Sequence, residues 1–508
     1  MLKKKSSKAK VLLIYPVTYK TTGLPAGLAT LSAVLKENGH DVGVFDTAFY
    51  AGLDKESISQ AKIKAERAMT EKVKDEDKYL PQNQSNIEKD IIDFIKRYKP
   101  DIIGISILEI VFNVSLRLTR TIKKNFSHIP IVAGGIFPSL SPEEVINEYS
   151  IDIVCIGEGE TALSELCNRV SKNESFVDIG GLWIKQNSKV HKNNLPKLHD
   201  LNKLPHPDYT EFDKRLFYKP MQGEMYKMVN ISTSRGCVFN CSFCASPKLA
   251  KLFNENSCGR YYRRMEMGRS FEQINFQIRR HSPQFIYFSS ENFLSITEKE
   301  FDMFIDKYRR IKLPFWIQTR IEGITKKRIL KLKNIGMHWL TIGLEHGNEK
   351  FRRRVLRRNY SNKEFFEKME VLRGLDIGAS INNMIGFPGE TRELIFDTIE
   401  VNKELIQRNP KLRSNVFLFT PFKGCELYNI CKEKELISED SIVSTSMLSE
   451  SSVINFPEAF QENLRGLIRT FNLYVRLPEK YHQDIRIAEK RNKEGDIKLR
   501  KLLKLIKN

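Results

Sequence analysis

The sequence predicts an α/β protein with an N-terminal doubly wound parallel sheet, a partial (β/α)6 barrel and a C-terminal helical region. Short β-rich apolar runs alternate with helical patterns in the first part of the chain, which is typical of parallel sheets. The alternation resumes farther along and repeats about six times, as in part of a barrel. The last part has helical periodicity and few glycines. A chain of 508 residues has room for several domains, which we place at residues 1–195, 196–225 (a linker), 226–425 and 426–508.

The first domain contains five apolar runs that predict buried strands. They lie at residues 10–17, 41–47, 100–108, 129–135 and 151–157. Between the first two runs, residues 27–40 predict a helix, because leucines recur there at helical spacing before a glycine. Residues 52–98 are charged and predict a mainly helical stretch.

Glycine-rich loops follow the predicted strands, at the edge where doubly wound sheets bind their ligands. The loops read LPAGLA, GIS, GGIFPS and GEGE. Glycine lets the backbone approach a ligand closely. One such loop is common in α/β proteins, so it is the combination that marks this edge as a candidate site. The candidate residues are Gly27, Gly104, Ser106, Gly134, Gly135, Gly157 and Glu158.

The second domain begins with a strand that runs into a glycine-containing loop at residues 228–236. Helices are expected at 270–280 and at 323–336, where the final glycine is a typical helix stop. The remaining strands, each with the loop that follows it, are expected at residues 284–293, 314–322, 338–349, 377–391 and 414–424.

Three cysteines, Cys237, Cys241 and Cys244, stand in the run SRGCVFNCSFCASP with C-x3-C-x2-C spacing. Crowded thiolates suit an iron–sulfur cluster, and three of them leave one iron of a 4Fe–4S cluster without a protein ligand. A structural zinc site is the alternative, but it needs a fourth ligand nearby, and Cys258 is fourteen residues on. The other cysteines show no paired spacing, which favours a reducing compartment.

The cysteine run resembles the cluster loop of radical S-adenosylmethionine (SAM) enzymes. In that family the amino and carboxylate groups of SAM chelate the fourth iron. Three other loops resemble the family as well. In the family, the loop similar to GLEHGNE lies near the substrate nucleoside, and the one similar to RRVLRRNYS lies near the methionine carboxylate. The loop similar to MIGFPGET lies at the adenine. The resemblance covers about residues 226–425 and implies SAM contacts from these residues: Phe243, Ser290, Arg320, Glu345, Arg358, Gly386 and Pro388.

Alternatives stay open for several of these positions. Glu345 is a solvated loop glutamate if it does not contact SAM, and Arg358 is one of five arginines in a short run. Arg320 has a plain surface role as its alternative. The loop that contains Ser290 departs from the pattern, because the related group more often has two aspartates there, and Glu291 is a substitute.

The first domain resembles the cobalamin-binding domain that precedes many radical SAM enzymes, and the linker LNKLPHPDY is similar to theirs. The chain is thus identified as a class B radical SAM methyltransferase-like protein. None of its nine histidines has an aspartate two residues earlier, so the D-x-H-x-x-G motif that supplies a cobalt ligand elsewhere is absent. A degenerate domain that packs without binding cobalamin is the alternative.

The net charge of +21 favours anionic partners in general but does not identify one. There is no apolar run long enough to cross a membrane, and the short run near the N-terminus is not a signal-peptide core. We therefore expect a cytoplasmic protein. The end of the chain, IKLRKLLKLIKN, predicts a basic amphipathic helix. It either contacts an anionic surface peripherally or packs on its own protein with the cationic face in solvent.

The resemblance implies reductive cleavage of SAM to a 5′-deoxyadenosyl radical, then cobalamin-dependent methylation of an unactivated carbon of a small molecule or lipid. The reductant is expected to be a protein such as a flavodoxin or ferredoxin. A radical cyclase or rearrangement enzyme and a non-catalytic cobalamin or redox sensor are alternatives. A tRNA methylthiotransferase would need a second cluster on three N-terminal cysteines, whereas only Cys155 and Cys167 precede Cys237, so nucleic acid is an unlikely partner.

Overall fold

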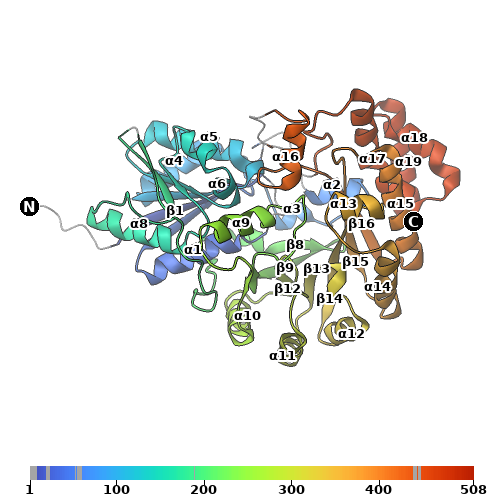
Figure 1. The fold of residues 1–508 in the computed structure, drawn as a ribbon, viewed down its shortest axis with the longest axis horizontal. Helices are drawn as coiled ribbons and strands as arrows, with labels where there is room; N and C mark the ends of the chain where they lie inside the picture. The colour runs from blue at the N-terminus through green and yellow to red at the C-terminus, as the bar shows by residue number, and fades with distance from the viewer. Residues whose placement is uncertain are drawn as a thin grey trace, which may run out of the picture.

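The computed structural model describes residues 8–18, 23–51, 53, 60–187, 189–438, 443 and 448–507. Two α/β units lie side by side, and the last helices pack at the far end of the second unit (Figure 1). The two seven-stranded sheets are formed by strands β1–β7 and by strands β8, β9 and β12–β16. This arrangement confirms the predicted fold class.

The first sheet has the strand order β2-β1-β3-β4-β5-β6-β7. The first five of these pair in parallel, and β6 and β7 add an antiparallel edge. The strand order reverses between β1 and β3, because the chain adds β2 on one side of β1 and β3 on the other. Doubly wound sheets bind their ligands at such a point. The strands are β1 (Lys10–Tyr15), β2 (Asp41–Asp46), β3 (Ile102–Ser106), β4 (Ile131–Gly134), β5 (Ile153–Cys155), β6 (Leu182–Gln186) and β7 (Lys189–Lys192).

Helices cover both faces of this sheet. Helices α1 (Ala26–Glu37) and α8 (Glu160–Lys172) pack together on one face, and α4 (Ile87–Tyr98) and α5 (Phe112–Asn125) pack on the other. In α4 three isoleucines at helical spacing are buried, and the Asn86 side chain caps its first turn. Two short helices, α6 (Ile136–Leu140) and α7 (Pro142–Asn147), follow β4.

The charged stretch predicted at 52–98 forms α2 (Gln60–Glu66), α3 (Glu76–Tyr79) and α4, while residues 52 and 54–59 lie outside the described residues. The first part of this stretch, which contains α2 and α3, lies away from the first sheet and packs on the second unit. The Arg67 guanidinium donates to the Leu448 carbonyl at 2.6 Å, and Lys74 N–H donates to the Gly223 carbonyl at 3.1 Å. This segment therefore ties the first unit to the second.

The second sheet has the order β16-β15-β14-β13-β12-β9-β8, in which six strands run parallel and β8 is an antiparallel edge. The parallel run confirms the predicted partial barrel. β8 is formed by the end of the segment predicted as a linker. The strands are β8 (Tyr218–Met221), β9 (Glu224–Ile231), β12 (Phe285–Phe288), β13 (Phe315–Thr319), β14 (Met337–Glu345), β15 (Ala379–Ile385) and β16 (Leu412–Leu418).

Five helices cover the outer face of this sheet, and Figure 1 shows them around its lower and right-hand sides. They are α10 (Met267–His281), α11 (Glu298–Tyr308), α12 (Lys326–Asn334), α14 (Asn362–Gly374) and α15 (Arg392–Arg408). The loops at the carboxyl ends of the strands contain the remaining short elements. These are β10 (Ser234–Arg235), α9 (Ser246–Glu255), β11 (Arg263–Arg264) and α13 (Glu349–Arg354).

Beyond residue 425, the described residues form four α-helices. They are α16 (Glu426–Glu433), α17 (Glu458–Arg476), α18 (His482–Glu489) and α19 (Lys493–Lys507). In α19, Leu502 is buried, and Leu499, Leu503 and Ile506 pack against a hydrophobic cluster that includes residues of α17. The apolar face of the basic helix is thus largely covered by its own protein. Lys493, Arg500, Lys501 and Lys504 are exposed, and Lys498 pairs with Asp484 of α18 at 2.7 Å. Within the described residues, no helix combines the length and apolar character needed to cross a membrane.

Candidate active site

The cysteine loop lies between β10 and α9, at the carboxyl end of β9. All eight cysteines are among the described residues, and each is a free thiol. Cys241 is buried, whereas Cys237 and Cys244 are half-buried. Cys258 packs with Leu249 and Phe253 instead, and its sulfur faces the Asn256 carbonyl. The loop therefore offers three thiols.

The spacing of the three sulfurs argues against a single metal ion. They do not all lie within 4.8 Å of one another. Tetrahedral thiolate ligands of zinc, with Zn–S bonds of about 2.3 Å, would lie roughly 3.8 Å apart. A cluster separates its ligands more widely, because each sulfur binds a different iron. The donor set and its spacing fit an iron–sulfur cluster.

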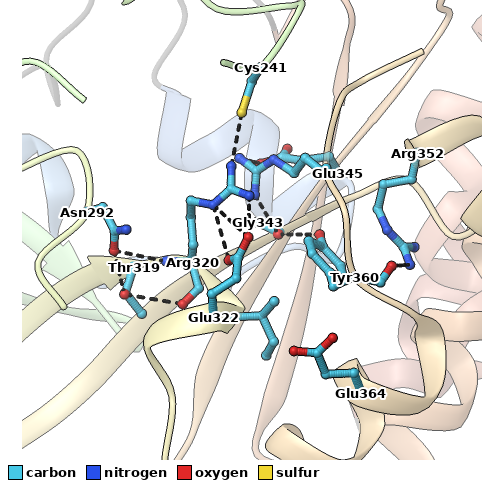
Figure 2. A network of polar contacts seen from close by, with 12 residues as sticks. Cys241, Asn292, Thr319, Arg320, Glu322, Gly343, Glu345, Arg352, Tyr360 and Glu364 are labelled. Carbon is cyan, nitrogen blue, oxygen red and sulfur yellow. Dashed lines mark hydrogen bonds and ion pairs between the residues drawn. The ribbon is translucent and has the colours of Figure 1, made fainter. Parts of the chain in front are cut away.

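Arg320, at the end of β13, touches this loop directly. Its guanidinium donates a hydrogen bond to Cys241 Sγ at 3.0 Å and lies 3.7 Å from the Phe239 ring centroid. Glu322 forms an ion pair with it, and Asn292 Oδ1 accepts from its backbone N–H (Figure 2). The resemblance implied that Arg320 contacts SAM. In this structure its side chain contacts a cluster thiol.

Glu345 and Arg358, both implied to face SAM, form an ion pair at 2.8 Å. Arg358 and the Tyr360 hydroxyl each donate to the Gly343 carbonyl at 3.1 Å. The Arg358 guanidinium lies 5.5 Å from the Phe243 ring centroid. Burial raises the pKa of Glu345, and the positive charge of Arg358 opposes that shift. Glu345 and Tyr360 lie next to Arg320 (Figure 2).

The backbone of β14 is shaped to make this ion pair. A bulge falls between Gly343 and Glu345, and Glu345 has φ +66°, which is uncommon for a residue with a side chain. A Cβ on Gly343 would lie 2.0 Å from Glu345 Oε1. Only glycine leaves room here for the buried carboxylate.

Gly386 and Pro388 lie in the loop after β15, and both are buried. Gly386 has φ +87°, and a Cβ there would meet Leu464 of α17 at 3.3 Å. The N–H groups of Gly386 and Phe387 donate to Glu390 Oε2. The conformation of this loop therefore depends on a buried carboxylate as well as on its glycines.

Glu390 is itself held by a fully buried histidine. His346 Nε2 lies 2.8 Å from Glu390 Oε1, and His346 Nδ1 accepts from the Asn348 N–H at 3.0 Å. Because Nδ1 is an acceptor, Nε2 carries the proton and donates to the carboxylate. The pair joins the loop after β14 to the loop after β15, and sequence reasoning missed it.

Ser290 does not join the group around the cysteines. It is fully buried, and its hydroxyl accepts from the Thr233 N–H at 3.3 Å, which links the loops after β9 and β12. The neighbouring Glu291 is exposed and lines the cavity described next. Nearby protein atoms partly desolvate its carboxylate, which raises the pKa of Glu291.

A cavity of about 470 Å³ separates the edge of the first sheet from the barrel mouth. Its first wall contains every residue predicted at the glycine-rich edge: Gly27, Gly104, Ser106, Gly134, Gly135, Gly157 and Glu158. The opposite wall includes Asn230, Gly236, Tyr261 and Glu291. Among the described residues that line the cavity there is no histidine, in keeping with the missing D-x-H-x-x-G motif. At Gly135, with φ +114°, a Cβ would lie 2.7 Å from the Ile107 carbonyl oxygen.

Glu158 lines the cavity, but its carboxylate is already engaged. It pairs with Arg263 and with Arg235 at 3.0 Å, and it accepts from the His199 N–H at 3.1 Å. Burial alone would raise the pKa of Glu158, but the Arg263 hydrogen bonds and the two positive charges outweigh it and lower the pKa to about 2. The sequence suggested a ligand contact, whereas the side chain joins the two units.

Glu160 adds to the same network, with Arg235 at 2.5 Å. Ligand atoms of Glu158, Glu160 and His199 lie within 4.8 Å of one another. The two arginines neutralise the carboxylates and occupy their lone pairs, so the group does not need a cation. Arg235 stands two residues before Cys237, and the network therefore connects the first sheet to the cysteine loop.

Comparisons with known proteins agree with both halves of this site. The B12 binding domain family matches residues 13–167, and the Radical SAM superfamily matches residues 231–401. An uncharacterized methyltransferase of Pyrococcus horikoshii is 26% identical over 441 residues, 84% of each chain. The hopanoid C-3 methylase of Methylococcus capsulatus is 26% identical over 364 residues, 68% of this chain and 64% of the other.

Solved structures with the same fold also span both units. The SAM radical methyltransferase TsrM of Kitasatospora setae, with cobalamin and a 4Fe–4S cluster bound, has a TM-score of 0.59 at 15% identity, covering 85% of this chain and 76% of the other. The cobalamin-dependent SAM radical enzyme OxsB has a TM-score of 0.66 at 15% identity, covering 98% and 71%. The three thiols fit a cluster, and the glycine-lined edge lies within the B12-binding match, so the cofactors are a 4Fe–4S cluster, SAM and cobalamin. The chain belongs to the radical SAM superfamily, as an enzyme with an N-terminal B12-binding domain.

Proposed function

We propose that the protein is a cobalamin-dependent methyltransferase that methylates an unactivated carbon of a small molecule or lipid. The observation that supports this most is the shared cavity. One wall is the glycine-rich edge of the first sheet, and the other includes Gly236, the neighbour of Cys237. Two relatives that span much of the chain are named as a methyltransferase and a methylase.

When bound, the cofactors supply one-electron cleavage of SAM and a transferable methyl group. The chain supplies position and charge. We propose that the three cysteines hold the cluster and that Arg320 offsets the negative charge of the Cys241 thiolate through its hydrogen bond. Glu345 and Arg358, locked together and buried, are proposed to present fixed charges to the polar groups of SAM.

The loop after β15 is proposed to contact the adenine through its backbone. The Glu390 carboxylate accepts from the N–H groups of Gly386 and Phe387, so the loop is already held in place by its own protein. Phe243 is proposed to pack against the nucleoside beside Arg358. A substrate bound in the cavity between the two units is proposed to displace water from it, which would protect a reactive carbon centre from side reactions.

Replacement of the cluster thiols tests the first half of the proposal. We expect Cys237→Ala, Cys241→Ala and Cys244→Ala each to lose most bound iron and acid-labile sulfide after anaerobic reconstitution. Cys258→Ala is the matched control, because its sulfur packs in an apolar cluster away from the loop, and it should retain both. Full iron content in a variant lacking all three thiols would contradict the proposal.

Product analysis tests the second half. The reconstituted protein, given SAM with a labelled methyl group and candidate substrates, should form 5′-deoxyadenosine and S-adenosylhomocysteine together with a labelled product. Label-free product together with 5′-deoxyadenosine would favour a cyclase or rearrangement enzyme. That alternative has one specific support, a 21% identity over 423 residues with the anaerobic magnesium-protoporphyrin IX monomethyl ester cyclase of Synechocystis, covering 82% of this chain and 74% of the other.

The proposal includes a protein reductant of the flavodoxin or ferredoxin type and a reducing, cytoplasmic setting, because cluster thiolates must stay reduced. A tRNA methylthiotransferase is disfavoured. Of the two cysteines before Cys237, Cys155 is buried in β5 and Cys167 in α8, and a second cluster would need three accessible thiols.

A further inference from the structure

The interior of the partial barrel is lined by side chains that remain partly accessible. Outward-facing residues of β13 and β15 are buried under the helices, whereas inward-facing residues alternate with them and are half-buried. β16 follows the same alternation except at Asn415, which is buried. Closed barrels fill their interior with packed side chains. The half-buried inward residues are Tyr287, Trp316, Gln318, Asn382, Met384 and Phe417. These side chains therefore remain partly accessible from the barrel interior.

Lys219 projects into this interior from β8. It pairs with Tyr226 in the register of β8 and β9, and its ammonium lies 4.7 Å from the Tyr287 ring centroid. Its relative exposure is 7%. Within the described residues, neither a carboxylate nor another acceptor contacts the ammonium, and burial lowers the pKa of Lys219 to about 8. Buried lysines are rare unless they are paired.

The Asn230 side chain, from β9, ends near the same place as that of Lys219, because a Cβ on Gly23 would lie 2.3 Å from Lys219 Nζ and 3.7 Å from Asn230 Nδ2. Its Nδ2 donates to the Leu24 carbonyl at 3.2 Å, while its Oδ1 is buried without a hydrogen-bond partner. Asn230 also lines the cavity between the two units, so this group of side chains lies next to that cavity. A buried, unpaired amide oxygen costs free energy that a ligand hydroxyl or N–H would recover.

An aromatic pair completes the pocket. Tyr287 pairs with Asn230 across β12 and β9, and Trp316 stacks on Tyr287 with ring centroids 4.3 Å apart. The Trp316 N–H donates to the Thr341 hydroxyl at 2.9 Å, which fixes the orientation of its ring. Gly23 of the first unit closes the other side, because a Cβ there would lie 2.3 Å from Lys219 Nζ.

We propose that this pocket is the substrate-recognition site and that it selects a substrate with an anionic group. Lys219 binds the carboxylate or phosphate, Asn230 accepts a hydrogen bond from a neighbouring hydroxyl or N–H, and the Tyr287–Trp316 pair supports a flat or apolar part. The inference rests on the proposed function, because it assigns the substrate class of that same enzyme. It adds a charge requirement that the family alone does not supply.

Binding of simple probes to the full-length holoenzyme tests this assignment without knowledge of the substrate. The probes are phenyl phosphate, phenylacetate and the neutral analogue benzyl alcohol, titrated calorimetrically. Wild type should bind one or both anions saturably, and the stronger anion distinguishes a phosphate site from a carboxylate site. Lys219→Met should weaken anion binding by roughly tenfold or more, the size expected for a hydrogen bond between charged groups. Lys214→Met, at an exposed lysine nearby, should bind as wild type does.

Equal anion affinity in wild type and Lys219→Met would overturn the inference. So would tighter binding of benzyl alcohol than of both anions, or no saturable anion binding to wild type. If Lys219→Met fails to fold, acylation of Lys219 in wild type, followed by mass spectrometry, gives a second measurement. The anions should slow labelling of Lys219 but not of Lys214, and unchanged labelling would overturn the inference.

The two proposals fail in distinguishable ways. If the anions bind wild type and Lys219→Met equally while iron content and SAM cleavage stay intact, only the requirement for an anionic substrate is contradicted. A wild-type protein that assembles no cluster removes the proposed function, whatever the anions do.

Discussion

Arg320 illustrates how one side chain can adjust a cofactor that it does not ligate. Its guanidinium donates to Cys241 Sγ at 3.0 Å and is only slightly exposed. A cation next to a thiolate stabilises the more negative, reduced form of a cluster. Its ion pair with Glu322 keeps it in place.

We therefore expect Arg320→Met to move the cluster potential to a more negative value, by roughly 60 mV for a tenfold change in a one-electron equilibrium. A redox titration followed by electron paramagnetic resonance measures the shift directly. Arg310→Met, at an exposed position on the surface, is the control and should leave the potential unchanged. An unaltered potential in Arg320→Met would show that the hydrogen bond has no electronic effect.

Gly343 is the second residue with a specific requirement. In Gly343→Ala the new methyl group would lie 2.0 Å from Glu345 Oε1, so the Glu345–Arg358 pair must shift. We expect a loss of about 1–3 kcal/mol in the free energy of unfolding, as for other overpacked sites, and weaker SAM binding.

Urea unfolding and equilibrium dialysis with SAM measure the two effects. Gly374→Ala is a matched control, since that glycine is in α14 and a Cβ there meets nothing within 4 Å. It should be neutral or slightly stabilising, because alanine favours helix over glycine. Equal behaviour of the two variants would contradict the steric argument.

At the scale of elements, buried charges fix the loops at the carboxyl ends of the barrel strands. His346 in the loop after β14 donates to Glu390 in the loop after β15, and Glu390 accepts from two backbone N–H groups. Leu464 of α17 packs against Gly386 in the same loop. The C-terminal helices thus support the site from outside the barrel.

We expect Glu390→Gln to destabilise the protein by about 1.5–3 kcal/mol, the range for a hydrogen bond to a charged group. A glutamine amide that accepts from the backbone would turn its NH₂ toward the N–H of His346, and the two donors would repel. Thermal unfolding measures the change, and Glu393→Gln, at an exposed position in the first turn of α15, is the control. A thermal midpoint like that of wild type would mean that the loop does not need this carboxylate.

At the scale of the whole molecule, the Glu158 network holds the two units in register around the cavity. The pKa of Glu158 is lowered from 4.5 to about 2 in the folded state. A lowered folded-state pKa stabilises the protein above the unfolded pKa, and the stabilisation is lost as the pH falls from about 4.5 to 2. The shift corresponds to about 3 kcal/mol at neutral pH, at 1.36 kcal/mol per pKa unit.

Glu158→Gln should therefore lower the free energy of unfolding of the apoprotein at pH 7, and its difference from wild type should shrink toward pH 2. Urea unfolding over a pH series measures both. Glu165→Gln, on the exposed side of α8, should follow wild type throughout. A constant difference at all pH values would show that Glu158 acts by packing rather than by charge.

The sequence by itself determined the cofactor loops and the fold, because these features are local. Three thiols within eight residues, glycines directly after apolar strands and the alternation of strand and helix can all be read along the chain. Parallel strands then bring the loops to one edge, so Gly27, Gly104, Gly134 and Gly157 met in one cavity as predicted. Only the tertiary structure decided which charges meet. Glu345 with Arg358, Glu158 with two arginines, His346 with Glu390 and the unpaired Lys219 depend on contacts between distant strands and on burial, and neither is encoded by any short run of residues.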